Sequence, residues 1–263
     1  MNLFFISTIY GSCSKPSLIL DELENLKGKL GYQIYALFVV DGKLNEDIVE
    51  HISNYRGGID VFVIENRKRL GQHRSIFEGI DFIVNRKMGI NLPADFPSSS
   101  DIFFILDGDM FEYIRYSQIF IKYLSKFDVV IGVILNKRYP ALRQILTHVF
   151  YVMLFSFSIF SPQKMKRIYC FLQKSGIDVS IYKFIRSRRT LHFSVFSSFK
   201  GSVLYRLPKT NNYLISLLSQ QERLEIGFVF LPPQNFSCGS SYSFYELFKL
   251  SLLTLKDVFR YFL

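Results

Sequence analysis

The chain has 263 residues, of which 49% are hydrophobic and 21% charged, so it can build one sizeable core and its composition argues against global disorder. Its formal net charge is +10, and the spacing of its three cysteines matches neither a metal site nor a C-x-x-C redox pair. We therefore expect reduced, buried or incidental thiols and a cytoplasmic protein.

Short apolar runs alternate with amphipathic segments in the first part of the chain. We predict strands over residues 3–9, 34–40, 61–65 and 102–106, separated by helices over residues 17–30, 46–55 and 71–84. This alternation predicts an α/β fold with a mostly parallel central sheet flanked by helices. Ligands of such sheets bind beyond the carboxyl ends of the strands.

The pattern changes in the second part of the chain. The Pro- and Ser-containing segment 88–100 indicates an exposed loop, and residues 128–135 form another predicted strand. We predict a long apolar helix over residues 142–160, which holds no stretch long enough to span a membrane. The sequence from Ser243 to Glu246 has the form of a capping box and starts an amphipathic helix. That helix either packs on the core or lies in a membrane interface.

Charge divides the chain into two unequal halves. Residues 1–112 hold 11 basic and 16 acidic residues, a balance of −5, whereas residues 113–263 hold 21 and 6, a balance of +15. We expect one domain over residues 1–263 in which the basic half meets an anionic partner: nucleic acid, an anionic lipid surface or a phosphorylated substrate. A solvated basic face without a partner is the alternative.

The motif Asp107-Gly108-Asp109 directly follows the predicted strand 102–106. Buried carboxylates at a strand end are costly unless they are solvated, paired or bound to metal, and carboxylates with phosphate oxygens suit Mg²⁺ or Mn²⁺. Asp107 and Asp109 are therefore candidate metal ligands beside a nucleotide diphosphate, although a simple polar turn has the same residues. Asp41 ends the second strand and could contact a base or ribose, or belong to an ordinary Asp-Gly turn.

The segment from Asn66 to His73 joins the third strand to the next helix and is rich in cations. Arg69 and its neighbours could approach a diphosphate or form a solvated basic loop, and His73 could be a structural or a substrate contact. The chain contains no G-x-G-x-x-G, P-loop, G-x-S-x-G or H-E-x-x-H motif, which argues against dehydrogenases, NTPases, serine hydrolases and zinc proteases.

The order of these motifs resembles family 2 glycosyltransferases of the GT-A fold. The resemblance is nearest to polyprenyl-phosphate sugar transferases of the dolichol-phosphate-mannose synthase and undecaprenyl-phosphate aminoarabinose transferase types. It is carried by the segments FVVDG, RKRLGQHRSIFEGI, FFILDGDM, FDVVIGV and CGSSYSFYELFKL. It implies a GT-A nucleotide-binding domain and transfer of a sugar from a nucleotide-diphosphate sugar, with Mg²⁺ or Mn²⁺ and inversion at the anomeric carbon.

Roles follow from the resemblance where residues match. The donor side would hold the nucleotide sugar, and the acceptor side would lie in the basic half. The resemblance implies that Asp41, Asp107 and Asp109 lie on the donor side and that Ser240 and Tyr242 lie on the acceptor side. We add two residues of the basic connection, Arg69 and His73, to the donor side and Lys200 to the acceptor side. No residue is identified as the general base.

The chain also departs from the family's pattern. Val40 replaces the first Asp of a pair, and Phe111 replaces a Gln after the DGD motif. Asn235 stands where relatives have Arg, and serines near Ser197 and Ser198 replace an acidic residue. The last two losses fall on the acceptor side, so the donor site is better supported.

These observations predict a glycosyltransferase acting on a lipid-linked or saccharide acceptor. We expect it in the cytoplasm, peripheral to the inner face of the cytoplasmic membrane, on an anionic membrane surface. The alternative is a catalytically impaired relative that binds nucleotide sugar or a partner transferase. We expect no nucleic-acid partner, because no nucleic-acid motif accompanies the basic half.

Overall fold

The computed structural model of the chain describes residues 1–11, 14–42, 46–89, 96–98, 100–135, 191–207, 224–233, 252–253 and 256. These residues form a seven-stranded sheet in the order β3-β2-β1-β4-β6-β5-β7. The strands are β1 (Asn2–Ile9), β2 (Gln33–Asp41), β3 (Asp60–Asn66), β4 (Ile102–Asp107), β5 (Val129–Leu135), β6 (Leu191–Lys200) and β7 (Ile226–Leu231). The helices are α1 (Pro16–Leu30), α2 (Glu46–Ser53), α3 (Gln72–Val84), α4 (Ser117–Leu124) and the 3₁₀ helices η1 (Phe111–Tyr116) and η2 (Gly201–Arg206).

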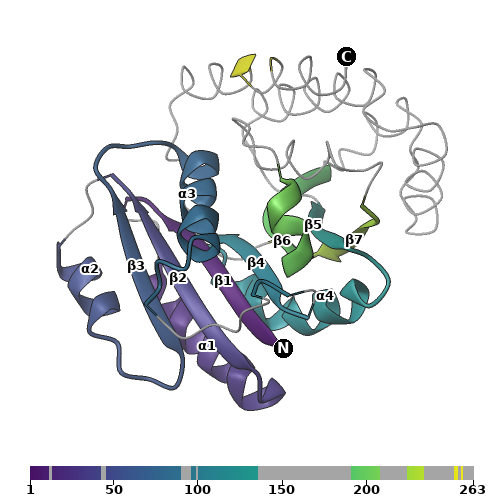
Figure 1. The fold of residues 1–263 in the computed structure, drawn as a ribbon, viewed down its shortest axis with the longest axis horizontal. Coiled ribbons are helices and arrows are strands. Elements are labelled where there is room, and N and C mark those ends of the chain that lie inside the picture. Colours follow the sequence, from purple (N-terminus) through teal and green to yellow (C-terminus); the bar gives the residue numbers. More distant parts are fainter. Residues whose placement is uncertain are drawn as a thin grey trace.

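The first four strands are parallel to one another, and β5 is parallel to β7. Strand β6 runs antiparallel to both of its neighbours, β4 and β5. The predicted α/β fold with a mostly parallel central sheet is therefore confirmed. Because β4 of residues 1–112 pairs with β6 of residues 113–263, the described parts of both halves share one sheet (Figure 1).

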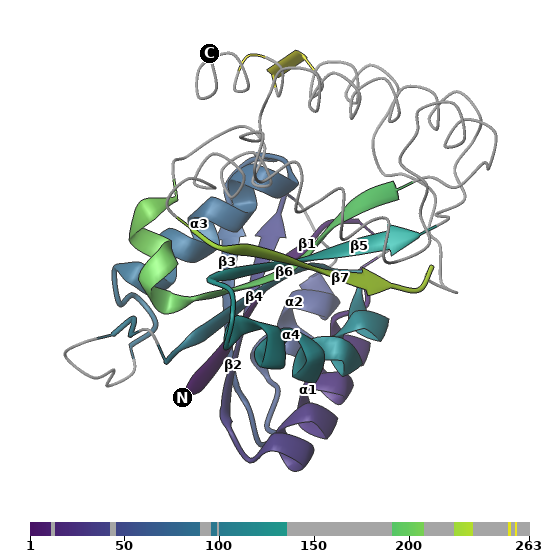
Figure 2. The ribbon, with the colours of Figure 1, turned by 90° about the vertical axis from the view of Figure 1, so that its right-hand side faces the viewer.

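Helices cover both faces of the sheet (Figure 2). On one face, α3 packs Ile76, Ile80 and Ile83 against β1 and β2. On the other face lie α1, α2, η1 and α4, with Leu23 of α1 and Phe120 of α4 fully buried. Each helix thus contributes the apolar side that its sequence period predicts.

The many phenylalanines of the described strands build the core. On the α3 face, the ring of Phe4 stacks on Tyr35 and Phe103 at centroid distances of 4.7 and 4.8 Å, and Phe103 stacks on Phe199 at 5.7 Å. On the opposite face, Phe5 stacks on Phe104 at 4.6 Å. Such cross-strand aromatic pairs stabilise a sheet. Among the described residues, a Phe-rich core therefore accounts for much of the aromatic content.

Several sequence expectations need correction. Strands β6 and β7, and helices η1 and α4, were not predicted. The segment 88–100 is not wholly exposed, because Met88, Phe96 and Pro97 are buried and Phe96 packs against Phe4 at 5.2 Å. The predicted helix 142–160 lies outside the described residues, as does the start of the helix at Ser243.

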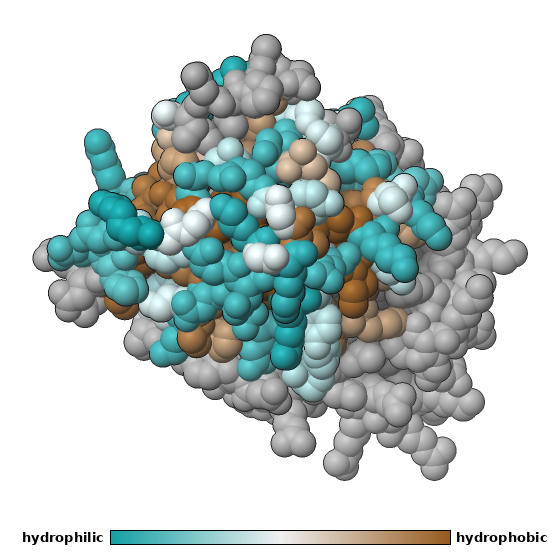
Figure 3. Space-filling view, turned by 90° about the horizontal axis from the view of Figure 1, so that it is seen from below, coloured by the Kyte–Doolittle hydropathy of each residue, from teal (hydrophilic) through white to brown (hydrophobic). Residues whose placement is uncertain are grey.

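The described surface carries scattered apolar side chains. Hydrophilic side chains dominate the face seen from below, with hydrophobic ones visible between them (Figure 3). The exposed large hydrophobic residues are Met1, Leu18, Ile119, Tyr123, Tyr205 and Leu252. No helix within the described ranges is apolar over a length that would cross a membrane.

Candidate functional site

The carboxyl ends of β1, β2, β3 and β4 meet at one edge of the sheet, because these strands are parallel. In the register, Thr8 of β1 lies beside Asp107 of β4, and Asp41 of β2 lies beside Asn66 of β3. The structure therefore brings the predicted donor-side carboxylates Asp41 and Asp107 to the same edge.

Asp41 is buried, with 3% of its surface exposed. Its Oδ1 accepts a hydrogen bond from the backbone N–H of Leu70 at 2.7 Å, and its Oδ2 accepts one from Gly71 at 2.8 Å. The side chain of Asn66 donates to the same Oδ1 at 3.3 Å and to Ser75 Oγ at 2.9 Å. The carboxylate thus fixes the connection between β3 and α3, and its predicted contact with a nucleotide stays a prediction.

Asp107 ends β4, and its carboxylate is held from two other elements. Its Oδ1 accepts hydrogen bonds from Thr8 Oγ1 at 3.1 Å and from the side-chain amide of Gln72, the first residue of α3. The backbone then turns, with Met110 N donating to the Asp107 carbonyl at 2.9 Å. Asp109 lies in this turn and is half-buried.

Gly108, between the two carboxylates, leaves no room for a side chain. A Cβ at this position would lie 2.6 Å from Ser14 Oγ and 3.0 Å from the Thr8 carbonyl oxygen. The backbone also bonds here, with Gly108 N donating to Thr8 O at 2.9 Å and Lys15 N donating to Gly108 O at 2.7 Å. The turn carrying Asp107 and Asp109 is therefore packed directly against the end of β1 and the start of α1.

Arg69 lies at the same edge, above the aromatic ring of Tyr10, which belongs to none of the motifs described above. Its guanidinium carbon is 4.0 Å from the centre of the Tyr10 ring, a distance typical of a cation–π contact. Gly42 is adjacent, since a Cβ there would lie 3.6 Å from Arg69 Cβ. Tyr10 directly follows β1, and its position after the first strand was the signal that could have identified it.

His73 occupies the first turn of α3, three residues before the buried Ile76. The residue as a whole is only partly buried, but its Nδ1 is enclosed and has no hydrogen-bond partner among the described residues. Burial lowers the pKa of His73 from 6.5 to about 4. The imidazole is therefore neutral at pH 7.

Of the three predicted acceptor-side residues, the structure describes Lys200, and Lys200 does not join this group. Lys200 pairs with Ile102, the first residue of β4, and so lies at the opposite, amino edge of the sheet. There its Nζ forms an ion pair with Asp128 Oδ1 at 2.9 Å. Ser240 and Tyr242, like Asn235, lie outside the described residues. The structure thus groups the donor-side residues and separates Lys200 from them.

The same ion pair sets the charge state of Asp128. Burial tends to raise the pKa of its carboxyl, but the hydrogen bond from Lys200, the backbone N–H of Glu225 and nearby positive charge outweigh burial and lower it. The ion pair between Lys200 and Asp128 therefore joins the end of β6 to the start of β5.

The donor set fits a divalent cation only in part. Asp107 and Asp109 offer two carboxylates, and the described residues hold no group of three His, Cys, Asp or Glu that could enclose a metal. Mg²⁺ sites of phosphate-handling enzymes commonly use one or two carboxylates and complete the shell with water and substrate phosphates. Asp107 and Asp109 would therefore hold such a cation only together with water and the phosphates of a nucleotide.

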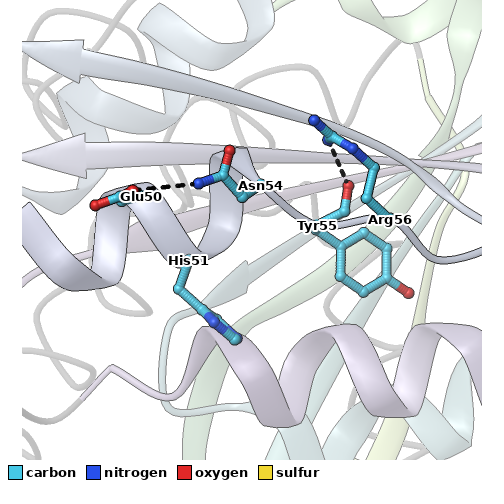
Figure 4. A pocket seen from close by; sticks show the side chains of 5 residues that line it. All are labelled: Glu50, His51, Asn54, Tyr55 and Arg56. Atoms are coloured by element: carbon cyan, nitrogen blue, oxygen red, sulfur yellow. Dashed lines mark hydrogen bonds between the residues drawn. The ribbon is translucent and has the colours of Figure 1, made fainter.

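A separate pocket of about 500 Å³ lies at the carboxyl-terminal end of α2, lined by Glu50, His51, Asn54, Tyr55 and Arg56. Asn54 Nδ2 donates to Glu50 Oε1 at 3.5 Å, and Arg56 donates to the Tyr55 carbonyl at 3.1 Å (Figure 4). Because α2 leads into the start of β3, this pocket is on the side of the amino edge. It is not part of the site that contains Asp107.

No protein-family model and no curated protein sequence matches the chain. Among solved structures, glucosyl-3-phosphoglycerate synthase from Mycobacterium tuberculosis in complex with Mn²⁺, uridine-diphosphate-glucose and phosphoglyceric acid is similar, with a TM-score of 0.59 and 12% identity over 98% of this chain and 79% of that chain. The complex of the same enzyme with uridine-diphosphate has a TM-score of 0.58 and 11% identity over the same shares. Mannosyl-3-phosphoglycerate synthase from Rubrobacter xylanophilus has a TM-score of 0.57 and 9% identity over 98% of this chain and 73% of that chain. The chain therefore has the GT-A-type fold of nucleotide-diphospho-sugar transferases.

Proposed function

We propose that the chain is a glycosyltransferase that binds a nucleotide-diphosphate sugar at the carboxyl edge of β1–β4. One observation carries this proposal: the Asp107-Gly108-Asp109 turn ends β4 in a GT-A-type fold and is tied to β1 and α3 by hydrogen bonds. Ligands of such sheets bind at this edge. The structure of similar fold that was solved with Mn²⁺ and uridine-diphosphate-glucose supports the same class of donor.

In the proposed reaction, the bond between the anomeric carbon and the diphosphate oxygen breaks, an acceptor hydroxyl oxygen bonds to that carbon, and the proton of that hydroxyl passes to water. Charge then develops on the departing nucleoside diphosphate. A divalent cation bound by Asp107 and Asp109 would neutralise that charge. We propose that Arg69 and Tyr10 lie beside the nucleotide, since they meet at the same edge and offer a cation and an aromatic face.

The acceptor follows from the sequence more than from the described residues. Asn235 stands where polyprenyl-phosphate transferases have Arg, and Asn cannot replace the charge and bidentate geometry of a guanidinium. We therefore propose a saccharide or a lipid-linked saccharide as the acceptor, with inversion at the anomeric carbon, and weak use of polyprenyl phosphate. Because the structures of similar fold are a glucosyl- and a mannosyl-3-phosphoglycerate synthase, the test also includes phosphoglycerate, a small anionic acceptor.

The test incubates the protein with a panel of nucleotide sugars and Mn²⁺ and measures the release of nucleoside diphosphate, with saccharide, phosphoglycerate and undecaprenyl-phosphate acceptors in parallel. We expect acceptor-dependent release from one class of nucleotide sugar, and release that is weaker by about tenfold or more from Asp109→Asn. Binding of a nucleotide sugar without release would favour the catalytically impaired alternative. Absence of binding to every nucleotide sugar in the panel would reject the donor site itself.

A further inference from the structure

Gln72 touches a candidate metal ligand without offering a charge. Its side-chain amide donates to Asp107 Oδ1, the same oxygen that accepts from Thr8 Oγ1 at 3.1 Å. We propose that Gln72 is a positioning residue, whose amide fixes the Asp107 carboxylate in the orientation that binds the metal of the donor site. This inference rests on the proposed function, because it concerns the metal that accompanies the nucleotide sugar.

The backbone before Gln72 is fixed from β2. Asp41 accepts the N–H groups of Leu70 and Gly71 at 2.7 and 2.8 Å, so the two residues that precede Gln72 are held by one buried carboxylate. Gly71 has φ +87° and ψ 151°, a conformation that L residues rarely adopt. This conformation lets α3 begin at Gln72 while its predecessor still binds Asp41.

The helix behind Gln72 is equally constrained. A Cβ at Gly79 would lie 2.8 Å from Ile6 Cγ2 and 3.0 Å from Val39 Cγ2, so α3 lies directly on β1 and β2. Ser75 Oγ accepts a hydrogen bond from Asn66 at the end of β3. The amide of Gln72 therefore reaches Asp107 from a rigid support, and one short segment connects β2, β3 and β4.

Two donors on one carboxylate oxygen have a physical consequence. They fix the plane of the carboxylate before the metal arrives, so less conformational freedom is lost when it binds. Mutation of a hydrogen-bond donor that orients a metal ligand typically lowers the metal affinity about 10- to 100-fold. Thr8 is β-branched and stiff in its strand, whereas Gln72 depends on the geometry of α3 for its reach. Both contacts are therefore expected to tune the affinity for metal.

The experiment measures Mn²⁺ binding by the loss of the free-ion electron paramagnetic resonance signal, with Mn²⁺ alone and with Mn²⁺ plus UDP. The variant Gln72→Met keeps an unbranched side chain of similar length but has no donor. Thr8→Val removes the second donor, while Thr8→Ser retains a hydroxyl and is its matched control. Glu78→Gln, on the exposed side of α3, controls for a change in the helix alone.

We expect Gln72→Met and Thr8→Val each to raise the Kd for Mn²⁺ about tenfold, and Thr8→Ser and Glu78→Gln to leave it unchanged. The melting temperature of Gln72→Met and Thr8→Val should fall by a few degrees, because the Asp107 carboxylate loses a hydrogen bond in each, whereas their metal-free UDP affinity should stay at the wild-type value. An unchanged Mn²⁺ affinity in Gln72→Met would overturn the inference, as would an equal loss of metal-free UDP affinity, which indicates a general structural role. A wild type that binds neither Mn²⁺ nor nucleoside diphosphate would instead refute the proposed function.

Discussion

Asp41 and Asp107 show how differently two carboxylates at one sheet edge are used. The Asp41 carboxylate accepts hydrogen bonds from two backbone N–H groups and is almost fully buried. The Asp107 carboxylate, at the end of β4, accepts hydrogen bonds from a hydroxyl group and from a side-chain amide. At the scale of residues, Asp41 therefore orders the β3–α3 connection, whereas Asp107 and Asp109 are the residues that we propose hold a metal beside a diphosphate.

Replacing Asp41 by Asn should destabilise the protein by about 1.5–3 kcal/mol, the range for hydrogen bonds to charged groups. Asn offers one acceptor oxygen, so its NH₂ group would face the backbone N–H of Leu70 or Gly71. Urea unfolding measures the loss, with exposed Glu78→Gln as a variant that should stay close to wild type. If Asp41→Asn unfolds at the wild-type urea concentration, the buried hydrogen bonds contribute nothing to stability.

His73 should make the stability of the fold depend on pH. Its pKa is about 4 in the folded chain and near 6.5 when unfolded, so between these values the unfolded chain binds more protons. The free energy of unfolding therefore includes a contribution from the neutral His73 side chain, which is complete above pH 6.5 and is lost as the pH falls toward 4. At pH 5, relative to pH 7.5, wild type should lose about 2 kcal/mol that His73→Gln does not lose.

Unfolding in urea at both pH values checks this dependence on His73. The control is His51→Gln, because His51 lies on the exposed surface of α2. This control should follow the pH dependence of the wild type. A His73→Gln variant with the wild-type pH dependence would contradict the burial of the imidazole.

The sequence drew attention to the charged residues of the candidate site and not to its neutral ones. The DGD motif and Asp41 stood out because a charge at the end of an apolar strand needs an explanation. Thr8, Tyr10 and Gln72 carry no charge, and only the parallel register and the approach of α3 place them beside Asp107 and Arg69. Their role depends on contacts between segments far apart in the chain, which spacing alone does not specify.

At the scale of elements, the first three βα units were predicted nearly to their ends, because each strand is an apolar run and each helix has one apolar side. Strand β6 was missed, since its apolar residues are interrupted by Ser194, Ser197 and Ser198. Ser197 and Ser198 are nevertheless fully buried between β4 and β5. Central placement in the sheet, which the sequence does not show, overrides their weak strand preference.

Two glycines offer a test of how the elements connect. Gly71 precedes α3 with φ +87°, whereas Gly28 lies inside α1, and a Cβ would meet nothing within 4 Å at either position. Gly71→Ala should therefore cost about 1–3 kcal/mol of backbone strain, while Gly28→Ala should stabilise the helix by about 0.5–1 kcal/mol. Urea unfolding of the two variants separates these effects. Equal stability of Gly71→Ala and wild type would show that the start of α3 does not need this conformation.

At the scale of the whole molecule, the charge of the sequence predicts an anionic partner. Residues 113–263 carry a net charge of +15, whereas residues 1–112 carry −5. Both halves belong to one sheet, because β4 pairs with β6. In the sequence from Ser243 onward, apolar residues recur at helical spacing and cations stand between them, which predicts an amphipathic helix. An interfacial helix of this composition binds membranes through both its apolar side and its cations.

We expect the protein to sediment with anionic liposomes at low salt and less with neutral ones, because each cation near an anionic surface contributes about 1 kcal/mol and salt screens it. Removing residues 244–263 should reduce the bound fraction. Protein that stays in the supernatant with anionic liposomes at low salt would contradict the membrane interpretation, and the basic half would then need another partner or none.

The most direct measurement concerns Asp109 and the metal. Calorimetric titration of wild type and Asp109→Asn with a nucleotide sugar, with and without Mn²⁺, isolates the metal-dependent part of the affinity. Because Asn keeps the shape of Asp but lacks the charge of a ligand, we predict an intact fold and metal-dependent binding weakened about tenfold or more. Equal metal-dependent binding by the two proteins would contradict the assignment of the donor site to the end of β4.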